Sequence, residues 1–399
     1  MKAPKIFLAS LLALSTASVA EAQTVIHITG STAFRSAVHN AILQILQPGF
    51  TYGYAGTSFT GASQAIFTGT AYTNNISVII KTSWSGSLAG IETVSQAYPS
   101  TVGTFLSNST PQSTSGTPSA PSTYDAPLIP EVCMSDGFQA TSQYPTPVLA
   151  AQTVGVVTFK FLRNAGAPAS LTNMTPLLAQ ALWANGSLPL SMFTGNTNDA
   201  TNLVYAIGRD PDSGTRKTAF LETGIQTFVS SLTPNLVLQY EPLNGSGVVN
   251  KANPGTITSQ VPWPQETVDN ITFVLGDGGY ASGGDLAWAM KATSPYIYVT
   301  YLGLSDAATA EGSGGGVATE MTYNGVAYTD QAVQNGQYTY WTYEQLDYSP
   351  TYGTTDANGK AVADALADEI RTNTAATVGE LLSTMHVTRA QEGGPVTPQ

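Results

Sequence analysis

The residues with the clearest chemical potential lie in one short stretch, 208–216, with the sequence Gly-Arg-Asp-Pro-Asp-Ser-Gly-Thr-Arg. An apolar, β-branched run before it predicts a strand, and the run after it has helical character, so Ser213 stands where a helix N-cap belongs. The first turn of a helix has unpaired N–H groups, which Gly214 leaves open to an anion and Thr215 can supplement with its hydroxyl. The planar fork of Arg209 matches a tetrahedral oxyanion. This turn therefore predicts an oxyanion site.

The same turn could be an ordinary helix cap beside a surface arginine, because Ser-Gly-Thr caps are common. Arg216, the second arginine of the stretch, falls on the helix after the cap and is expected to face solvent. The oxyanion hypothesis therefore depends on matching groups elsewhere in the chain.

Residues 209–215 resemble the Arg-x-x-x-Ser-Gly-Thr signature of PstS-type periplasmic phosphate-binding proteins, the receptors of bacterial ABC phosphate importers. Three further pieces occur in the order of that family. They are Ile-Thr-Gly-Ser-Thr-Ala-Phe at 28–34, Trp-Ser-Gly-Ser-Leu-Ala-Gly-Ile at 84–91 and Met-Ser-Asp-Gly at 134–137. The resemblance covers most of the chain and implies binding of inorganic phosphate or a similar oxyanion.

The resemblance also implies roles for hydroxyl residues at two other predicted strand-to-helix turns. Ser31 and Thr32 would offer hydroxyl and N–H groups to the phosphate, although alanine precedes the phenylalanine of this motif, where many members have threonine. Ser85 and Ser87 would form a second set of donors at the start of the next helix. Simple helix capping is the alternative for all four residues.

The resemblance also implies that Asp136 makes the site select phosphate over sulfate. In the family, an aspartate at this place accepts a hydrogen bond from the proton on the bound phosphate. A carboxylate facing an anion is costly unless a proton lies between them, so sulfate, which lacks that proton, would be refused. A turn cap beside Gly137 is the alternative.

Composition narrows the class of protein. The chain has 399 residues, enough for two lobes with separate cores, and only 10% are charged. The formal net charge of -12 makes nucleic acid and anionic membranes poor partners. It does not exclude a buried anion held by local donors, because distant charges are screened. Cys133 is the only cysteine, so no disulfide can form within the chain.

Residues 1–22 have the pattern of a cleaved secretory signal peptide, with two lysines, an apolar run and Ala-Glu-Ala before Gln23. The apolar run is short for a membrane span, and no second long one follows. A retained membrane anchor is the alternative. We expect a soluble mature protein in the periplasm or outside the cell.

Strand-like and helix-like runs alternate along the chain, which indicates an α/β protein with its ligand at the carboxyl ends of parallel strands. Together with the resemblance, this predicts a bilobed type II periplasmic-binding-protein-like fold with two hinge crossings. Residues 23–152 and 297–399 would form lobe I, and 153–296 lobe II. The lobes are expected to close on the ligand by hinges near 154–157 and 297–301.

Two stretches have no counterpart in a minimal member of the family. Residues 51–73, rich in Gly, Thr and aromatic residues, are interpreted as an inserted hairpin. Residues 107–122, rich in Ser, Thr and Pro, are expected to form an exposed, mobile loop. From Thr388 onward we expect a polar tail.

Catalysis would need a nucleophile with a base, and none of the three histidines adjoins Ser213 in a triad motif. These histidines are His27, His39 and His386. No cluster has metal-ligand spacing, and the glycines at 276–284 lack a nucleotide-binding motif. We therefore expect a monomeric, non-enzymatic receptor without metal or cofactor, whose implied partner is an ABC permease. The alternatives are a surface or extracellular-matrix adhesin on the same fold and, less favoured, a phosphate-ester hydrolase that uses Ser213.

Overall fold

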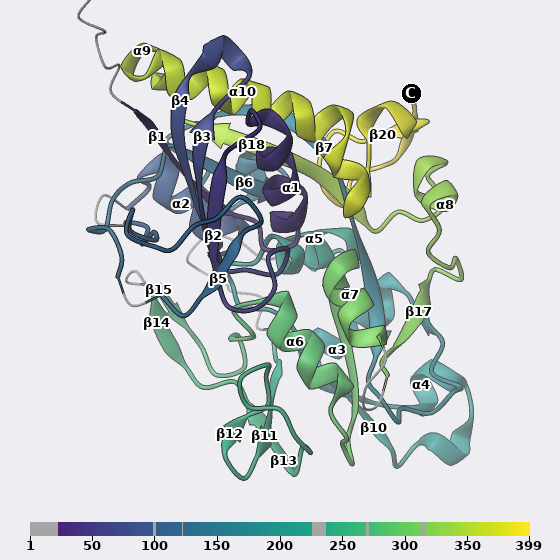
Figure 1. The fold of residues 1–399 in the computed structure, drawn as a ribbon. Coiled ribbons are helices and arrows are strands. Elements are labelled where there is room, and N and C mark those ends of the chain that lie inside the picture. Colours follow the sequence, from purple (N-terminus) through teal and green to yellow (C-terminus); the bar gives the residue numbers. More distant parts are fainter. Residues whose placement is uncertain (1–22, 99–100, 122, 226–236, 269–270, 313–316) are drawn as a thin grey trace, which may run out of the picture.

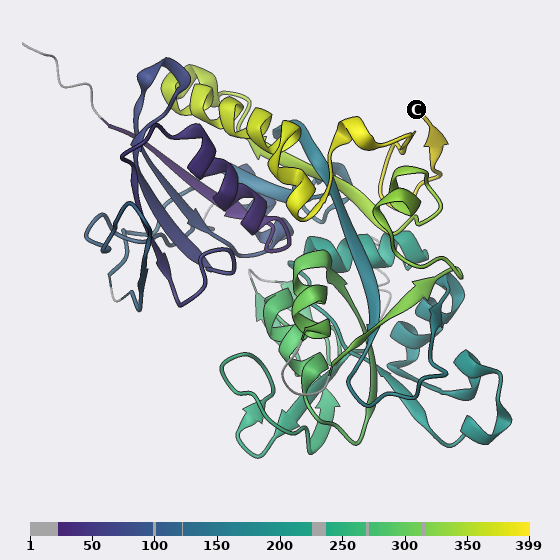
Figure 2. The same ribbon diagram turned by 45° about the vertical axis from the view of Figure 1, so that its right-hand side comes forward.

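The computed structural model describes residues 23–98, 101–121, 123–225, 237–268, 271–312 and 317–399 (Figure 1). The expected signal peptide, residues 1–22, lies outside the described residues. The described chain has the α/β class that the sequence predicts, with a mixed sheet of 14 strands and helices on its faces. Its elements gather in two bodies (Figure 2). Within these residues, no helix is both long and apolar enough to cross a membrane.

The first body is built on three adjacent parallel strands. β1 (Thr24–Gly30) lies between β4 (Ser77–Ser83) and β6 (Val132–Asp136) and is parallel to both. Almost every residue of these strands is buried, as expected for parallel strands covered on both faces. The covering helices are α1 (Arg35–Ile45), α2 (Ser87–Ser95), α9 (Tyr352–Thr355) and α10 (Ala357–Thr372). Because the strands are parallel, their carboxyl ends meet at one edge of the sheet.

The outer edge of this body contains the two stretches that we interpreted as insertions, at 51–73 and 107–122. β2 (Thr51–Ala55) and β3 (Gln64–Thr70) are antiparallel, so the predicted hairpin at 51–73 is confirmed. Of the exposed, mobile loop predicted at 107–122, the described residues 107–121 are mostly half-buried or exposed, as expected. The loop nevertheless contains a strand, because β5 (Thr117–Ser119) pairs with β2. The outer edge of β2 has main-chain N–H and C=O groups that need hydrogen-bond partners, and β5 provides those partners.

One strand passes through both bodies. β7 (Ala150–Arg163) pairs along its first two thirds with β18 (Trp341–Tyr348), which also pairs with β6. The last five residues of β7 pair with β16 (Ile297–Gly303). In Figure 2, β7 runs without interruption from the upper body to the lower one. The register with β18 shifts between Glu344 and Gln345, which is a β-bulge inside the predicted hinge segment 154–157.

The second body continues the sheet from β16. β10 (Leu203–Ala206) is parallel to β16, and β17 (Thr319–Tyr323) pairs with the end of β7. This pairing groups residues 297–323 with the second body. The return crossing that we expected at 297–301 therefore lies instead between β17 and β18. The sequence of β16 is apolar enough for a strand of either body. Only the pairing of β16 with β7 and β10 shows to which body it belongs.

The remaining elements of the second body flank this sheet or form small sheets. Its helices are α3 (Pro176–Asn185), α4 (Ser191–Thr194), α5 (Gly214–Thr223), α6 (Gly283–Lys291) and α7 (Leu304–Glu311). Its other strands are β8 (Asn173–Met174), β9 (Ser187–Pro189), β11 (Tyr240–Asn244), β12 (Gly247–Val248), β13 (Ser259–Pro262), β14 (Glu266–Val268) and β15 (Ile271–Phe273). Two short elements, α8 (Asp330–Gln334) and β19 (Gly379–Glu380), follow later in the chain.

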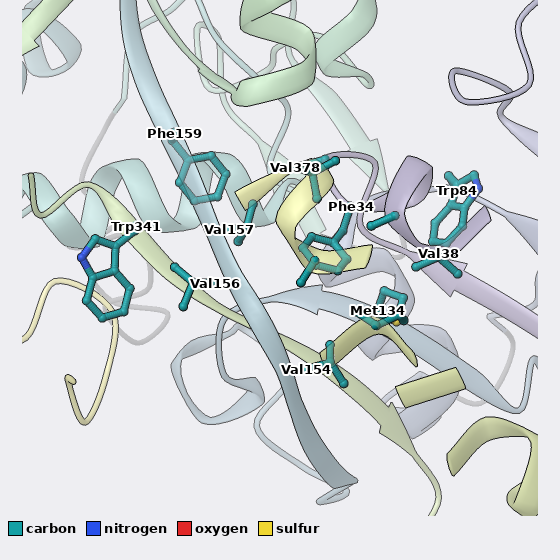
Figure 3. Packing of buried hydrophobic residues seen from close by; sticks show 14 of the residues in the cluster. Phe34, Val38, Trp84, Met134, Val154, Val156, Val157, Phe159, Trp341 and Val378 are labelled. Carbon is teal, nitrogen blue, oxygen red and sulfur yellow. The ribbon is translucent and has the colours of Figure 1, made fainter. Parts of the chain in front are cut away.

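Apolar residues of β7 form the centre of the first core. Figure 3 shows Val154, Val156, Val157 and Phe159 along this strand, with Phe34 nearby from the turn before α1. A Cβ on Gly155 would lie 2.7 Å from the Cβ of Ala375, so glycine is required for this close approach. The core therefore fixes the turn after β1 against the strand that joins the bodies.

The C-terminal segment is folded rather than a simple polar tail, so that expectation is wrong. β20 (Val387–Thr388) pairs with β21 (Thr397–Pro398). Between them, Arg389 and Glu392 are buried and form ion pairs of 2.9 Å with α5, through Glu222 and Lys217 respectively. The two partners lie more than 160 positions earlier in the chain, so the local sequence gives no sign of them.

Candidate oxyanion-binding site

Three helix starts and one strand end converge between the two bodies. Ser31 and Thr32 lie in the turn from β1 to α1, and Ser87 is the first residue of α2 after β4. Asp136 ends β6, which is adjacent to β1 in the sheet. The start of α5 comes from the second body, and the main-chain N–H of Leu88 bonds to the Asp212 oxygen at 3.0 Å. The parallel order of the strands explains why groups far apart in sequence meet here.

Asp136 is the centre of this cluster. Its carboxylate accepts hydrogen bonds from the hydroxyl of Ser31 and from Thr215 Oγ1, the latter at 3.2 Å. Its own N–H donates to Ser87 Oγ at 3.0 Å. All four residues are buried, with 2% or less of each exposed. The structure therefore brings together four of the predicted residues from both bodies.

Gly214 and Ser213 form the start of α5 as the sequence predicts. Ser213 is the N-cap, and its Oγ accepts the N–H of Arg216 at 3.2 Å. A Cβ on Gly214 would lie 2.7 Å from the Cβ of Asp136, so only glycine allows the helix start to come this close. The first turn of α5 therefore packs directly against Asp136.

Arg209 is buried beside Thr32. Its Nε donates to the Tyr280 oxygen and its Nη2 to the Ala281 oxygen, both at 2.9 Å, while Nη1 lies 3.4 Å from Thr32 Oγ1. The guanidinium has five N–H donors, and these contacts use three of them among the described residues. The carbonyl groups thus hold the fork in place and leave donors for a ligand.

Ser85 lies apart from this cluster. Its side chain is exposed, and its Oγ lies 3.0 Å from Thr29 Oγ1. No hydrogen bond of the described residues joins it to Asp136 or to Arg209. The position after β4 that contributes to the cluster is Ser87.

The expectation that Arg216 faces solvent is wrong. Arg216 is buried, and its Nη1 donates to the Arg209 oxygen at 3.2 Å and to the Asp277 oxygen at 2.6 Å. Its Nη2 forms an ion pair with the Asp277 carboxylate. The loop containing Asp277 covers this side of α5, which cannot be foreseen from the helix sequence alone.

Several ionisable residues near the cluster were not anticipated. Glu344 and Asp347, on β18, are fully buried, and burial raises the pKa of both carboxyls, that of Asp347 to about 7. Ser135 Oγ donates to Asp347 at 2.7 Å, which opposes this rise. The sequence alone could indicate a strand that contains these acids. Only the register of that strand with its neighbours identifies what the acids face.

A cavity of about 390 Å³ is lined by residues of both bodies, but none of the cluster residues described above is among them. Its wall includes Arg35, Asn40 and Lys251 with several hydroxyl residues. Arg35 follows Thr32 by one helical turn and lies 3.8 Å from the buried carboxylate of Asp306. Burial raises the pKa of Asp306, while the Arg35 and Arg209 charges oppose that rise. The wall of this cavity therefore contains both cationic and acidic groups.

The chemistry available here is recognition of an anion. Hydroxyl, guanidinium and helix N–H donors surround one carboxylate, which suits a tetrahedral oxyanion that carries a proton. The three histidines are engaged elsewhere: His27 with Glu131, His39 with Thr82, and His386 with Asn335. In the described part of the chain, no group of three His, Cys, Asp or Glu residues could hold a metal ion.

Comparison of the sequence with protein-family models and with curated proteins found no match. Solved structures do show similarity. One, described as a phosphate ABC transporter substrate-binding protein with bound phosphate from Clostridium perfringens, is 13% identical with a TM-score of 0.48, and the match covers 90% of this chain and 99% of that one. An ABC-type phosphate transport receptor from Vibrio cholerae is 12% identical with a TM-score of 0.45, with the same coverage of both chains. PstS from Borrelia burgdorferi is 12% identical with a TM-score of 0.38, covering 88% and 94%.

Proposed function

We propose that this protein is a PstS-type phosphate receptor that binds hydrogen phosphate between its two bodies. One observation carries the proposal: the Asp136 carboxylate accepts hydrogen bonds from Ser31 and Thr215 and lies beside the start of α5. A buried carboxylate among anion-binding donors is an unfavourable neighbour for a bare anion and a favourable one for an anion with a proton. Arg209 would supply the bidentate fork opposite this acceptor.

Calorimetry on protein freed of phosphate tests the proposal. Phosphate and arsenate should both bind, with Kd values of roughly micromolar or tighter, as many charge-assisted bonds in a dehydrated cleft permit. Absence of heat for both anions would remove the proposal and favour the adhesin alternative. Incubation with a chromogenic phosphate ester is the companion assay, and turnover lost in Ser213→Ala would favour the hydrolase alternative.

We further propose that the protein acts outside the cytoplasm as a receptor for an ABC importer and closes on its ligand. The resemblance of its four motifs supports the importer, and the donors from both bodies support closure, because such a clamp is complete only when shut. Deleting the gene should lower phosphate uptake at limiting phosphate, whereas an adhesin role would leave uptake unchanged. Solution scattering should show a smaller radius of gyration with phosphate than without it.

A further inference from the structure

Asp136 has a second carboxyl group directly opposite it. β6 and β18 are antiparallel, and Asp136 is paired in register with Glu344. Side chains of directly opposed residues project from the same face of a sheet, with Cβ atoms about 4.5 to 5.5 Å apart. Asp136 is 2% exposed and Glu344 0% exposed, so both carboxyl groups are shielded from bulk water.

Among the described residues, no donor stabilises a charge on Glu344. Neither of its carboxyl oxygens accepts a hydrogen bond from a described residue. The cation whose charge reaches it is Lys217 on α5, but Lys217 Nζ lies 2.9 Å from the buried carboxylate of Glu392. An ionised and unpaired carboxylate in this place would be very costly.

The groups that face Glu344 come from each element packed around it. Asp136 on β6 and Asp347 on β18 are acidic, and Lys217 on α5 is basic. Lys217 is itself paired with Glu392 of the C-terminal segment. Burial and then the Asp136 charge raise the pKa of Glu344 well above its usual range. Two buried carboxyls in contact share a proton, since both cannot be ionised at low cost.

We propose that Glu344 is protonated in the folded protein and donates its hydrogen bond to Asp136, as a positioning residue behind the oxyanion site. A carboxylate offers about four acceptor positions. Ser31 and Thr215 occupy two of those on Asp136, and the Glu344 proton occupies a third. One acceptor position on Asp136 then remains for a proton carried by the ligand. This number matches an anion that donates a single hydrogen bond. This last step rests on the proposed function.

The proposal predicts a pH dependence. As pH rises through the elevated pKa of Glu344, the site gains a second negative charge and binds phosphate more weakly. Glu344→Gln cannot ionise. When the pH is raised from 7 to the highest value at which both proteins stay folded, the phosphate affinity of the wild type should therefore fall about tenfold or more further than that of Glu344→Gln. Comparing the two proteins cancels the titration of phosphate itself. Glu241→Gln is the control, because Glu241 is also buried but lies in β11, and its profile should match the wild type.

Infrared difference spectroscopy tests the proton without any ligand. At pH 7, the carbonyl band of protonated carboxylic acids should be weaker in Glu344→Gln than in the wild type by the contribution of one acid, whereas any contribution of Asp347 should be common to both proteins. If Glu344→Gln does not fold, Glu344→Asp serves, because the band should then shift rather than weaken. No such band in the wild type, or a band unchanged in both variants, would overturn the proposal. Failure of phosphate to bind would remove only the proposed function, since the infrared result stands alone.

Discussion

Arg216 Nη1 lies 3.2 Å from the main-chain oxygen of Arg209, so the second arginine of the turn holds the first in place. The two guanidinium groups therefore have different tasks. Arg209 directs its fork toward Thr32 and the cluster, whereas Arg216 ties the start of α5 to Asp277. If the proposed function is correct, Arg209 contacts the ligand and Arg216 supports Arg209.

The first prediction distinguishes the two arginines. Arg209→Ala should weaken phosphate binding by about thirtyfold or more, equivalent to ~2 kcal/mol, because it removes one partner of a buried charged pair. Arg216→Ala should weaken binding less but lower the free energy of unfolding by about 1–3 kcal/mol, because the Asp277 carboxylate loses its partner. Calorimetry and urea denaturation measure the two effects. Arg209→Lys controls for charge, since lysine lacks the planar fork; equal loss of affinity in both alanine variants would contradict this division.

The second prediction concerns selectivity at Asp136. Wild-type protein should bind phosphate and refuse sulfate, because the carboxylate accepts a hydrogen bond from a protonated ligand and repels a bare dianion. Asp136→Asn replaces one acceptor with a donor-bearing amide of the same shape, so it should lose much of this discrimination. A competition titration of both anions on the two proteins is the measurement. Sulfate binding by the wild type, or a large preference kept by Asp136→Asn, would show that Asp136 is only a structural cap.

The third prediction concerns the C-terminal segment. Lys217 and Glu392 form a buried ion pair of 2.9 Å, with 1% and 0% of their side chains exposed. Glu392→Gln should lower the free energy of unfolding by about 3–5 kcal/mol, because it leaves a buried lysine uncompensated. The double variant Lys217→Met/Glu392→Leu should recover much of that loss, since a buried pair can be replaced by apolar residues.

A matched control for this pair is available at the surface. Asp368, whose side chain is 71% exposed, pairs with Arg371 on α10. Asp368→Asn should change the free energy of unfolding by less than about 1 kcal/mol, as is usual for exposed pairs. Chemical denaturation of all variants is the measurement. A loss in Glu392→Gln no larger than in Asp368→Asn would mean that the C-terminal segment does not hold α5.

The sequence predicts the local parts of the site well and the long-range parts poorly. Ser213 caps α5 as expected, because capping depends on residues within one turn. The burial of Arg216 depends on Asp277, which is 61 positions away, and the pairing of Asp136 with Glu344 depends on strand register. The return crossing was misplaced for the same reason, since the β16 run is apolar in either body.

The fourth prediction concerns acid stability and His39. Its Nε2 accepts the N–H of Trp84 at 3.0 Å and lies 2.9 Å from Thr82 Oγ1, while Nδ1 lies 3.1 Å from the Phe59 oxygen. An accepting Nε2 must be unprotonated, and burial lowers the pKa of His39 to about 3. Protonation would therefore break the Trp84 contact and place a charge in the core.

The sign of the effect follows from the ordinary histidine pKa of 6.5 in the unfolded chain. Below that pH the unfolded chain binds a proton that the folded protein refuses, so stability falls as the pH drops from 6.5 toward 3. At pH 5, His39 alone should cost about 2 kcal/mol relative to pH 7. Urea denaturation at both values should show a smaller drop for His39→Gln than for the wild type, by about that amount. His386→Gln is the control, because His386 is exposed and should not alter the drop. If the wild type and His39→Gln lose stability equally on acidification, His39 does not titrate in this window.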